Sequence, residues 1–433
     1  MVRRLRPMPV YSSAMPRRCD LSRPPQRGTA RHAASLFVLA VLLAACGAAT
    51  PAPTPTASPA PTALPTVTAT PPRTPTPTFS PSATPTQRAS PAPPLTPTPT
   101  PAITVERGSL APGFSLTVYA GVPAPTNLAF GPDGRLYVSS TNSAVYAVAA
   151  GPTPARGGAV TPYAVGLDTP LGLAWVGGEL FISIRGGVVA VRDSNGDGLA
   201  ETRRTVLSNL PSFGLHQNDS LALGADGALY LGQGTTCDHC VESDPRNGTI
   251  LRFKPDGSDL EVYAHGMRNP YGLAFNALGD LFATDNGRDD LGPSLPPEEL
   301  NWVRQGLDYG WPDCWPGLSL PACASVAQPV ATFDAHTSAD GLAFYDAHQF
   351  PADFYDNAFV AILGSIYMFP SDPEHGVARV QLSQTAAGYS AQTSWFLRLP
   401  EGRPVALTVG PDGALYVADY QNGEIDRIVY GAP

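Results

Sequence analysis

The chain has 433 residues, among them 49 prolines and 42 glycines, and only 15% of its residues are charged. The formal net charge of −9 and the presence of a single lysine, Lys254, argue against a nucleic-acid-binding protein. A multi-span membrane protein is excluded because the sequence contains no apolar run of about 18 residues or more.

Residues 1–45 have the pattern of an export signal. Residues 1–31 contain eight arginines and one acid, and ten apolar residues follow shortly afterwards. A basic segment before a short apolar core is typical of a secretion signal and is too short to span a bilayer. Because the sequence Leu-Ala-Ala-Cys-Gly at 43–47 resembles a bacterial lipobox, we predict lipidation of Cys46. The exported chain would then be anchored to the outer face of a bacterial membrane, at the cell surface or in the periplasm. An ordinary signal peptide, cleaved just before Cys46, is the alternative.

Residues 46–104 are predicted to be a disordered linker. Eighteen prolines lie between Pro51 and Pro101, in a segment of little else but Pro, Thr, Ala and Ser. Such a segment cannot bury enough apolar surface to offset its chain entropy, and its Pro-Thr repeats favour extended polyproline II. The folded domain is therefore expected over residues 105–433.

One hairpin pattern recurs six times in this domain. It consists of a strand beginning Leu-Ala-Phe, a Gly/Asp turn and a strand of the type Leu-Tyr-Val, and the fifth of the six copies is degenerate. The copies recur every 45–70 residues, which is close to the length of a four-stranded blade. We therefore predict an all-β fold, a six-bladed β-propeller of four-stranded antiparallel blades, with a β-sandwich as the alternative. The copies lie at 127–138, 172–182, 220–231, 272–283, 341–362 and 405–417.

The domain contains four cysteines in two local pairs, Cys237 with Cys240 and Cys314 with Cys323. Export makes a disulfide the expected state of each pair. The Cys-Asp-His-Cys sequence at 237–240 also admits a metal or redox site, but the chain has no second Cys-x-x-Cys motif to complete a zinc site.

One loop has a spacing typical of calcium sites. Asp193, Asn195, Asp197 and Glu201 occupy positions 1, 3, 5 and 9 of an EF-type loop, while Arg204 stands where the bidentate glutamate would be. We predict a peripheral structural Ca²⁺ here, and the alternative is a turn stabilised by Asp and Asn side chains.

Three long polar loops are the candidates for ligand binding, because propellers place ligands at the mouth of the central channel. They contain His216, the pair Arg268-Asn269, and the segment 284–301. In chain order their motifs are a histidine before a blade strand, Arg-Asn-Pro-Tyr-Gly-Leu-Ala, Asp-Asn-Gly-Arg-Asp, Glu-Leu-Asn and Tyr-Gly-Trp-Pro. Across residues 205–315 this series resembles the soluble PQQ-dependent glucose/sorbosone dehydrogenase family, whose members are six-bladed propellers.

The resemblance implies pyrroloquinoline quinone (PQQ) and Ca²⁺ as cofactors, and a sugar as the substrate. It assigns His216 as the base that removes the hydroxyl proton and Arg268 as the cation that stabilises the reduced quinone. Asn269, Asn286 and Arg403 match further cofactor contacts. The backbone carbonyls of Gly287 and Arg288 match the calcium ligands of the family. The electron acceptor is not identified by the sequence.

The fifth repeat departs from the family. Residues 363–368 read Leu-Gly-Ser-Ile-Tyr-Met, where the sorbosone-type branch has a sequence of the type His-Gly-Ser-Trp-Asn-Arg. A charged contact to the cofactor is therefore missing, and Arg379 is a candidate to replace it. Two alternatives to a dehydrogenase remain: a cofactor-free propeller that binds a glycan or protein, and a Ca²⁺-dependent propeller hydrolase such as a lactonase.

Overall fold

The structure is a computed structural model that describes residues 103–105, 108–365, 374–386 and 388–432. The predicted signal peptide, Cys46 and the predicted linker up to residue 102 lie outside these described residues. Within the described part, no helix has the length and apolar character needed to cross a membrane.

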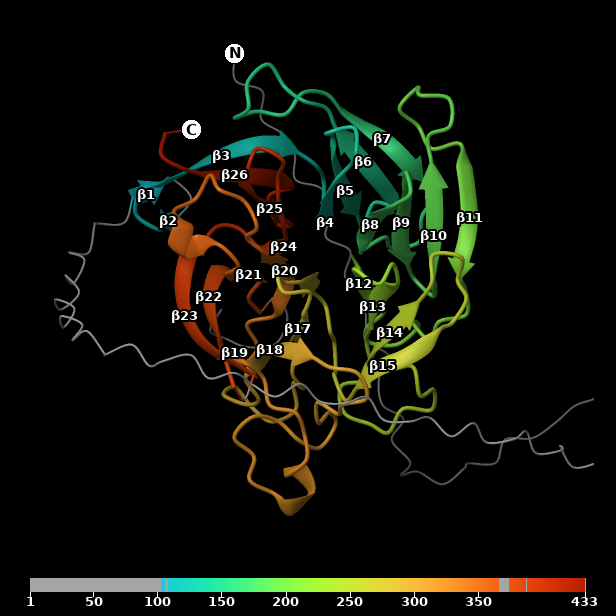
Figure 1. Ribbon diagram of the computed structural model, residues 1–433, viewed down its shortest axis with the longest axis vertical. Coiled ribbons are helices and arrows are strands. Elements are labelled where there is room, and N and C mark those ends of the chain that lie inside the picture. The colour runs from blue at the N-terminus through green and yellow to red at the C-terminus, as the bar shows by residue number, and fades with distance from the viewer. Residues whose placement is uncertain (1–102, 106–107, 366–373, 387, 433) are drawn as a thin grey trace, which may run out of the picture. The chain divides into compact units, whose positions relative to one another are not determined.

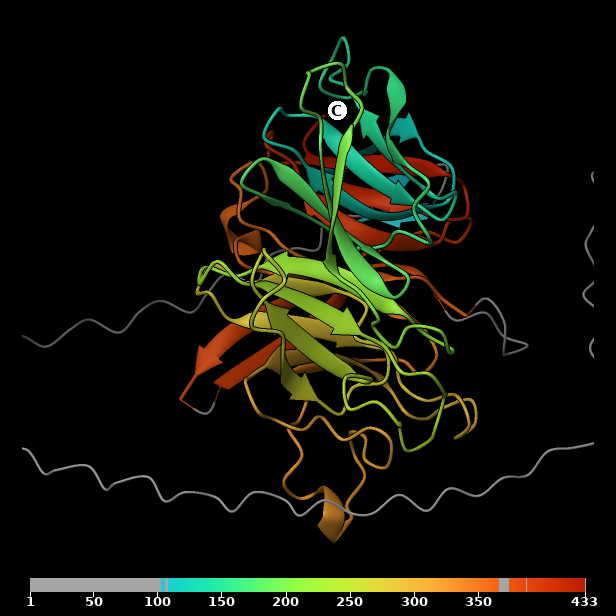
Figure 2. The ribbon, with the colours of Figure 1, turned by 90° about the vertical axis from the view of Figure 1, so that its right-hand side faces the viewer.

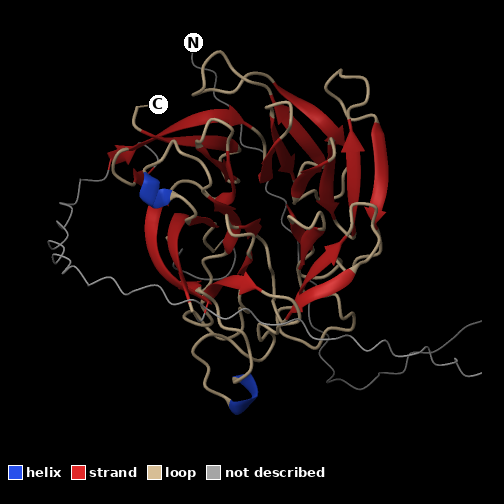
Figure 3. Cartoon of the chain, in the orientation of Figure 1, coloured by secondary structure: helices blue, strands red, loops and turns tan. Residues whose placement is uncertain are grey.

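Six antiparallel sheets are arranged around a central axis, which confirms the predicted six-bladed propeller (Figures 1 and 3). We number the blades in chain order from the blade that begins with β4. Each of the first three is a four-stranded sheet whose strands pair in chain order. Blade one contains β4 (Pro125–Phe130), β5 (Leu136–Ser140), β6 (Ala144–Val148) and β7 (Val160–Val165). Blade two contains β8 (Leu173–Val176), β9 (Glu179–Ile184), β10 (Gly187–Arg192) and β11 (Thr202–Leu207). Blade three contains β12 (Asn218–Leu223), β13 (Leu229–Gln233), β14 (Thr249–Phe253) and β15 (Glu261–His265).

The other three blades include the two ends of the described chain. Blade four contains β16 (Leu273–Phe275), β17 (Leu281–Asp285), β18 (Glu298–Val303) and β19 (Ala331–Phe333). Blade five contains β20 (Ala339–Phe344), β21 (Ala358–Ile362), β22 (Gly376–Thr385) and β23 (Gly388–Arg398), and β2 (Gly108–Leu110) and β1 (Ile103–Val105) extend its outer edge. Blade six contains β24 (Pro404–Val409), β25 (Leu415–Asp419), β26 (Glu424–Tyr430) and β3 (Phe114–Gly121).

The ring is closed by pairing the two ends of the domain. The early strand β3 lies antiparallel to the last strand, β26, and completes blade six (Figure 1). This pairing covers the edge of β26 and joins the early part of the domain to its end, so that every blade has a neighbour on both sides. Neighbouring blades pack through shared apolar clusters, as where Phe282 and Leu300 of blade four meet Phe344 and Val360 of blade five.

The repeated turn explains why the hairpins form. At the turn between β4 and β5, Gly134 has a φ of 78°, a left-handed conformation that favours glycine. The hydroxyl of Tyr137 donates a hydrogen bond to Asp133 of the same turn at 2.7 Å. The same tyrosine-to-aspartate bond recurs in blade three, from Tyr230 to Asp226 at 3.1 Å. The turn aspartate and the tyrosine four residues later therefore belong to one local unit.

The loops that carry the predicted ligand-binding residues emerge at the same end of the ring. In each blade the connection to the next blade and the connection between the second and third strands leave the sheet at the same edge, because the strands are antiparallel. The connection between β18 and β19, the third and fourth strands of blade four, begins at the opposite edge; it includes the 3₁₀-helix η1 (Pro321–Cys323) and projects from the ring (Figure 2). A second 3₁₀-helix, η2 (Ala352–Phe354), connects β20 and β21.

Both predicted disulfides are confirmed. Cys237 is bonded to Cys240, and Cys314 is bonded to Cys323. The alternative of a metal site at residues 237–240 is not supported, because both of its sulfurs are joined to each other.

Candidate functional site

A cavity of about 630 Å³ lies among these loops. This volume falls within the range of about 300–1,000 Å³ that is usual for small-molecule sites. The loops of blades three, four and five form its wall, and its lining includes both His216 and Arg268. The fold thus brings together the predicted base and the predicted cation, which are separated by 52 positions in the sequence (268 − 216).

His216 lies in the connection between β11 and β12 and is held by blade three. Its backbone N–H donates to the carbonyl of Thr235 at 3.0 Å, and its Nδ1 lies 3.1 Å from the Thr235 hydroxyl. Burial, followed by the positive charge of Arg268, lowers the pKa of His216 from the ordinary 6.5 to about 3. The imidazole is therefore neutral at pH 7 and available as a proton acceptor.

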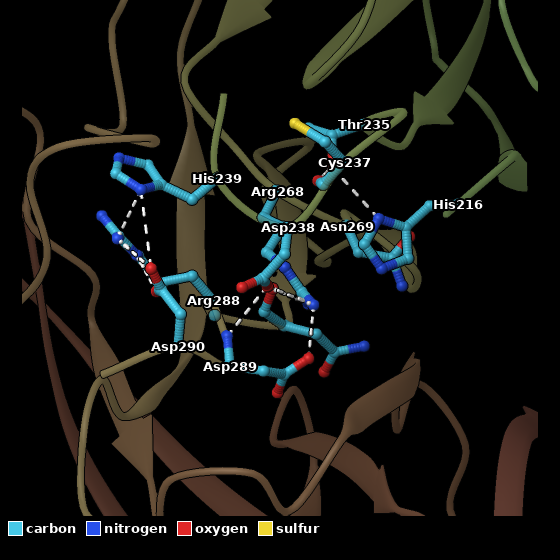
Figure 4. Close-up of polar contacts among 12 residues, drawn as sticks. His216, Thr235, Cys237, Asp238, His239, Arg268, Asn269, Arg288, Asp289 and Asp290 are labelled. Carbon is cyan, nitrogen blue, oxygen red and sulfur yellow. Dashed lines mark hydrogen bonds and ion pairs between the residues drawn. The ribbon is translucent and has the colours of Figure 1, made fainter. Parts of the chain in front are cut away.

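Arg268 lies in the connection between β15 and β16, and only 5% of its side chain is exposed. Its guanidinium forms ion pairs with Asp238 at 2.8 Å and Asp289 at 2.6 Å, and it donates a hydrogen bond to the carbonyl of Asn286 at 3.1 Å (Figure 4). Asp285 at the end of β17 accepts hydrogen bonds from the backbone N–H groups of Arg268 and Asn269. The position of the cation is therefore determined by side chains from blades three and four together.

Several buried polar atoms at the cavity lack a partner. Within the described residues, no hydrogen-bond partner is found for Nε of Arg268 or for the side-chain oxygens of Asn269 and Asn286. Buried polar atoms are normally paired, so this arrangement is suited to a polar group that is not part of the chain. Gly234 makes the close approach possible, because a Cβ there would lie 2.5 Å from the Cβ of His216 and 2.8 Å from the side-chain oxygen of Asn269.

Gly287 and Arg288 follow Asn286 in the connection between β17 and β18. Gly287 lines the cavity, and its N–H donates to Glu298 at 2.6 Å. Arg288 points its guanidinium at Asp290 and at the carbonyl of Pro312, so its side chain is occupied outside the predicted calcium position. Among the described residues, no donor contacts the carbonyl oxygens of Gly287 and Arg288. Carbonyl oxygens of this kind suit a hard cation such as Ca²⁺.

The predicted contact Arg403 is not among the residues that line the cavity, but it hydrogen-bonds to Leu363, which is. Its Nη1 donates to the carbonyl of Leu363 at 3.1 Å, and its Nε donates to Gln421 at 3.3 Å. Leu363, Gly364 and Ser365 line the cavity, and the remainder of the segment 363–368 lies outside the described residues.

Arg379 cannot replace the missing fifth-blade cation, contrary to the sequence-based suggestion. It lies in β22, where its guanidinium donates to Asn357 and Asp353 and stacks over the ring of Phe354 at 3.6 Å. These partners occupy the cation on the blade, and Arg379 is not among the residues that line the cavity.

Three residues at the site were not singled out by the sequence analysis, namely Thr235, Asp238 and His336, and a fourth, Glu298, was included only within the candidate segment 284–301. Asp238, Glu298 and His336 line the cavity, and Thr235 contacts His216. His336 lies against Asp289 at 3.1 Å and adopts a φ of 62°, which is unusual for a residue other than glycine. Asp238 could have been suspected because it lies inside the Cys-x-x-Cys motif, and Glu298 because it lies in the candidate segment 284–301, whereas Thr235 and His336 have no local sequence signal.

Buried carboxyl groups underlie the cavity. Burial raises the pKa of Glu298 to about 8 and that of Asp340 to about 7. Burial also raises the pKa values of Asp219 and Glu299, and neighbouring carboxylates add to the effect. Burial raises the pKa of Asp285 as well, against the opposing effect of the hydrogen bonds that it accepts from the backbone N–H groups of Asn269 and Arg268. Asp340 accepts hydrogen bonds from Asn286 and Ser338 at 3.0 and 2.9 Å, so these acids also hold the loops of the site in place.

The raised pKa of Glu298 predicts a loss of stability at alkaline pH. The unfolded chain releases this proton near the ordinary value of 4.5, whereas the folded protein keeps it until about pH 8. The stabilisation is therefore complete below pH 4.5 and is lost as pH rises through about 8. Between pH 5 and pH 9 we expect the free energy of unfolding to fall by about 2–4 kcal/mol more in the wild type than in Glu298→Gln.

Urea denaturation at both pH values would measure this difference. Glu374→Gln is the control, since that carboxylate is 65% exposed in its ion pair with Arg398. Parallel pH curves for the wild type and Glu298→Gln would contradict the prediction.

A second cavity of about 330 Å³ adjoins the first and shares Leu215, His216 and Asn269 with it. Phe213 and Gln217 also line this second cavity, and 76% of Phe213 is exposed. Phe213 therefore presents the apolar face of its ring to solvent, beside the amide of Gln217. His216 thus stands at the boundary between two spaces.

The predicted peripheral calcium loop forms a compact turn away from the cavity. Oxygens of Asp193, Asp197 and Glu201 lie within 4.8 Å of one another. Asp193 accepts hydrogen bonds from the N–H groups of Gly196 and Gly198, as in the turn that was the alternative interpretation. The side-chain amide of Asn195 donates to Asp197 at 3.1 Å. Calcium binding at this loop stays a prediction.

Comparisons with known proteins agree with the fold and relate it to sugar dehydrogenases. The family described as Domain of unknown function (DUF7133) matches residues 158–427. Aldose sugar dehydrogenase YliI of Escherichia coli (strain K12) is 25% identical over 254 residues, which cover 52% of this chain and 63% of that protein.

Two solved structures show the same propeller architecture. The holo form of the pyranose dehydrogenase PQQ domain from Coprinopsis cinerea superposes with a TM-score of 0.63 at 17% identity, covering 74% of this chain and 96% of that one. The calcium structure of the Trichoderma reesei Carbohydrate-Active Enzymes Family AA12 gives a TM-score of 0.62 at 20% identity, covering 76% and 98%. The chain is therefore similar in fold to sugar dehydrogenases of the PQQ type.

Proposed function

The chain belongs to the DUF7133 family, whose description names no activity, and we propose from the geometry of its cavity that it is a dehydrogenase of aldoses or related sugars that uses PQQ and Ca²⁺. The observation that carries this proposal is the joint placement of a neutral, buried His216 and a buried Arg268 in one cavity with unpaired polar atoms. The similarity to an aldose sugar dehydrogenase supports the same chemistry.

The residues of the first cavity fit a flat, polar cofactor with a bound cation. Arg268 would supply positive charge beside the quinone, while Asn269 and Asn286 would supply side-chain contacts. The carbonyls of Gly287 and Arg288 would hold Ca²⁺. When bound, PQQ accepts a hydride from the sugar carbon and Ca²⁺ polarises the quinone carbonyl. Arg403 would support the wall of this cavity through its hydrogen bond to Leu363.

His216 performs the proton transfer in this proposal. Its Nδ1 is engaged by Thr235, so the proton of the sugar hydroxyl would be accepted at Nε2. The depressed pKa keeps the ring neutral before the reaction. Arg268 would stabilise the negative charge that develops on the bound cofactor. A fixed cation that is sheltered from water is effective in this role, because it needs little reorganisation during the reaction.

The second cavity would bind the sugar. Its shared wall places the substrate beside His216, while the exposed ring of Phe213 offers an apolar face and Gln217 offers an amide. Sugars present both apolar C–H faces and hydroxyl groups, so this combination of side chains suits them.

The test is reconstitution with added PQQ and Ca²⁺. We expect the loaded protein to reduce a dye in the presence of an aldose, and to be inactive after Ca²⁺ is removed by a chelator. The absence of dye reduction across a broad panel of sugars, with PQQ shown to be bound, would contradict the proposal.

A cofactor-free propeller that binds a glycan or protein is the second candidate. It is favoured by the wall segment Leu363-Gly364-Ser365, which offers no charge to a cofactor with three carboxylates. The lack of PQQ binding in a calorimetric titration would support this candidate instead. A lactonase is not favoured: in the described part of the chain, sets of three His, Cys, Asp or Glu ligand atoms within 4.8 Å occur only at 193–201 and 237–242.

We also propose that the protein is exported and held at the outer face of a bacterial membrane. In this arrangement residues 1–45 are the signal peptide, Cys46 carries the lipid, and residues 46–104 separate the propeller domain of 105–433 from the bilayer. Metabolic labelling with a fatty acid tests the anchor. Label is expected in the wild type and not in Cys46→Ala, and equal labelling of both would contradict it.

A further inference from the structure

The four-residue loop Cys237–Cys240 lies in the connection between β13 and β14 and is closed by its own disulfide. The carbonyl of Cys237 in this loop accepts a hydrogen bond from Thr235, the residue that contacts His216. The carboxylate of Asp238 in the same loop pairs directly with Arg268 (Figure 4). We propose that this loop is a positioning element of the site, which orients His216 through Thr235 and Arg268 through Asp238. This inference rests on the proposed function, in which His216 is the base and Arg268 the stabilising cation.

The first connection runs from the loop to His216. The Thr235 hydroxyl donates its hydrogen bond to the carbonyl of Cys237 at 2.7 Å. A threonine hydroxyl has a single hydrogen, so the same oxygen must act as an acceptor toward Nδ1 of His216, which lies 3.1 Å away. Nδ1 therefore carries the hydrogen of the neutral ring, and Nε2 presents its lone pair. The loop carbonyl thus selects the tautomer that a base acting at Nε2 requires.

The second connection runs from the loop to Arg268. One carboxylate oxygen of Asp238, Oδ1, lies 2.8 Å from Nη2 of Arg268 and accepts the backbone N–H of Asp289 at 2.9 Å. The carbonyl of Asp238 accepts a hydrogen bond from the indole N–H of Trp311 at 3.0 Å. Asp238 is therefore anchored at its main chain and at its side chain, and it holds one end of the guanidinium in place.

The disulfide makes these two connections act together. The two acceptors, the Cys237 carbonyl and the Asp238 carboxylate, belong to adjacent residues in a ring closed over three residue steps. A bond that closes a short loop removes backbone freedom that an open loop would have. The loop therefore holds the spacing between the supports of His216 and Arg268, and small displacements at a reacting site reduce rates strongly.

The tautomer of His216 gives a direct test that needs neither cofactor nor turnover. The chain has seven histidines, and ¹⁵N labelling of histidine reports the protonation of each ring nitrogen, with the signals of His216 identified by their loss in His216→Gln. We expect the apo-protein and Thr235→Ser to have hydrogen on Nδ1 and a bare Nε2. Thr235→Val, which lacks the hydroxyl, should show a mixture of tautomers, and the loaded enzyme should lose about tenfold or more in kcat.

Two double variants test the role of the disulfide. Cys237→Ser/Cys240→Ser should disturb the His216 signals as Thr235→Val does and should lower kcat by about 10- to 100-fold. Cys314→Ser/Cys323→Ser removes the other disulfide, whose residues do not hydrogen-bond to His216 or Arg268 in the described structure, and should change the signals and kcat much less than Cys237→Ser/Cys240→Ser does.

Asp238→Asn tests the second connection without altering the disulfide. It should lower kcat while the His216 signals keep the Nδ1–H pattern. Its control is Asp244→Asn in the same β13–β14 connection, where the carboxylate pairs with Arg246 and not with the site.

A wild-type ring with hydrogen on Nε2, unchanged spectra in Thr235→Val, or equal effects of the two double variants would overturn the proposal. Unaltered kcat in Asp238→Asn would overturn its second connection. Failure of the proposed function is seen separately, as absence of sugar-dependent dye reduction by the wild type, because the tautomer is measured on the apo-protein.

Discussion

Replacing Arg268 with methionine is expected to lower the free energy of unfolding by about 3 kcal/mol and to abolish PQQ binding. The guanidinium is 5% exposed and forms ion pairs with two carboxylates, Asp238 and Asp289. Its removal breaks both of these ion pairs beside the cavity. Loss of one partner from a buried pair costs about 3–5 kcal/mol, and the lower end applies because the carboxylates retain 29% and 28% exposure.

Urea denaturation and calorimetric titration with PQQ would measure the two effects. Arg246→Met is the matched control, since Arg246 pairs with Asp244 at 2.7 Å on a more exposed surface, with 30% and 29% exposure. Such a pair contributes about 0–1 kcal/mol. Adding Asp238→Asn to Arg268→Met should restore part of the stability. Equal losses in the two single variants, or full PQQ binding by Arg268→Met, would contradict this prediction.

Replacing His216 with glutamine is expected to reduce kcat/KM by about 10²–10⁴-fold, because the substrate proton loses its acceptor. PQQ affinity should change little, since the assigned cofactor contacts are other residues. His265→Gln is the control: that histidine is half exposed and pairs with Asp308 on the outer strand β15. Loss of PQQ binding in His216→Gln, or activity equal to the wild type, would argue against a base at this position.

The pH profile gives a second measure of the same residue. The pKa of His216 is lowered to about 3 by burial and by Arg268, so the base stays neutral, and kcat/KM should not fall as pH drops from 7 to 5. A base with the ordinary pKa of 6.5 would lose most of its activity over that range.

The lowered pKa of His216 also makes the free energy of unfolding depend on pH. The unfolded chain binds this proton below pH 6.5, so the contribution of His216 to stability decreases as pH falls toward 3. In Arg268→Met the pKa of His216 should rise, since one of its two lowering causes is removed.

The blades and their turns could be predicted because the information is local. The alternation of Leu128, Ala129 and Phe130, the turn at Asp133-Gly134 and the strand that follows occur within twelve residues. A similar spacing recurs in five of the six hairpins, whereas β20 and β21 of the fifth are joined by a longer connection that contains η2; in every blade each of these strands pairs with a close sequence neighbour. Both disulfides were predictable for the same reason, since their cysteines are separated by 3 and 9 positions.

The sequence alone thus determined the all-β class, the number of blades, the disulfide pairs and the loops that carry His216 and Arg268. Only the tertiary structure decided which groups meet at the cavity. Asp238 reaches Arg268 across 30 positions (268 − 238), and His336 reaches Asp289 across 47 (336 − 289). The tertiary structure also decided that the guanidinium of Arg379 donates its hydrogen bonds to Asp353 and Asn357 on blade five rather than into the cavity. The physical reason is that hairpin pairing depends on neighbours in the chain, whereas contacts between blades depend on closing the whole ring.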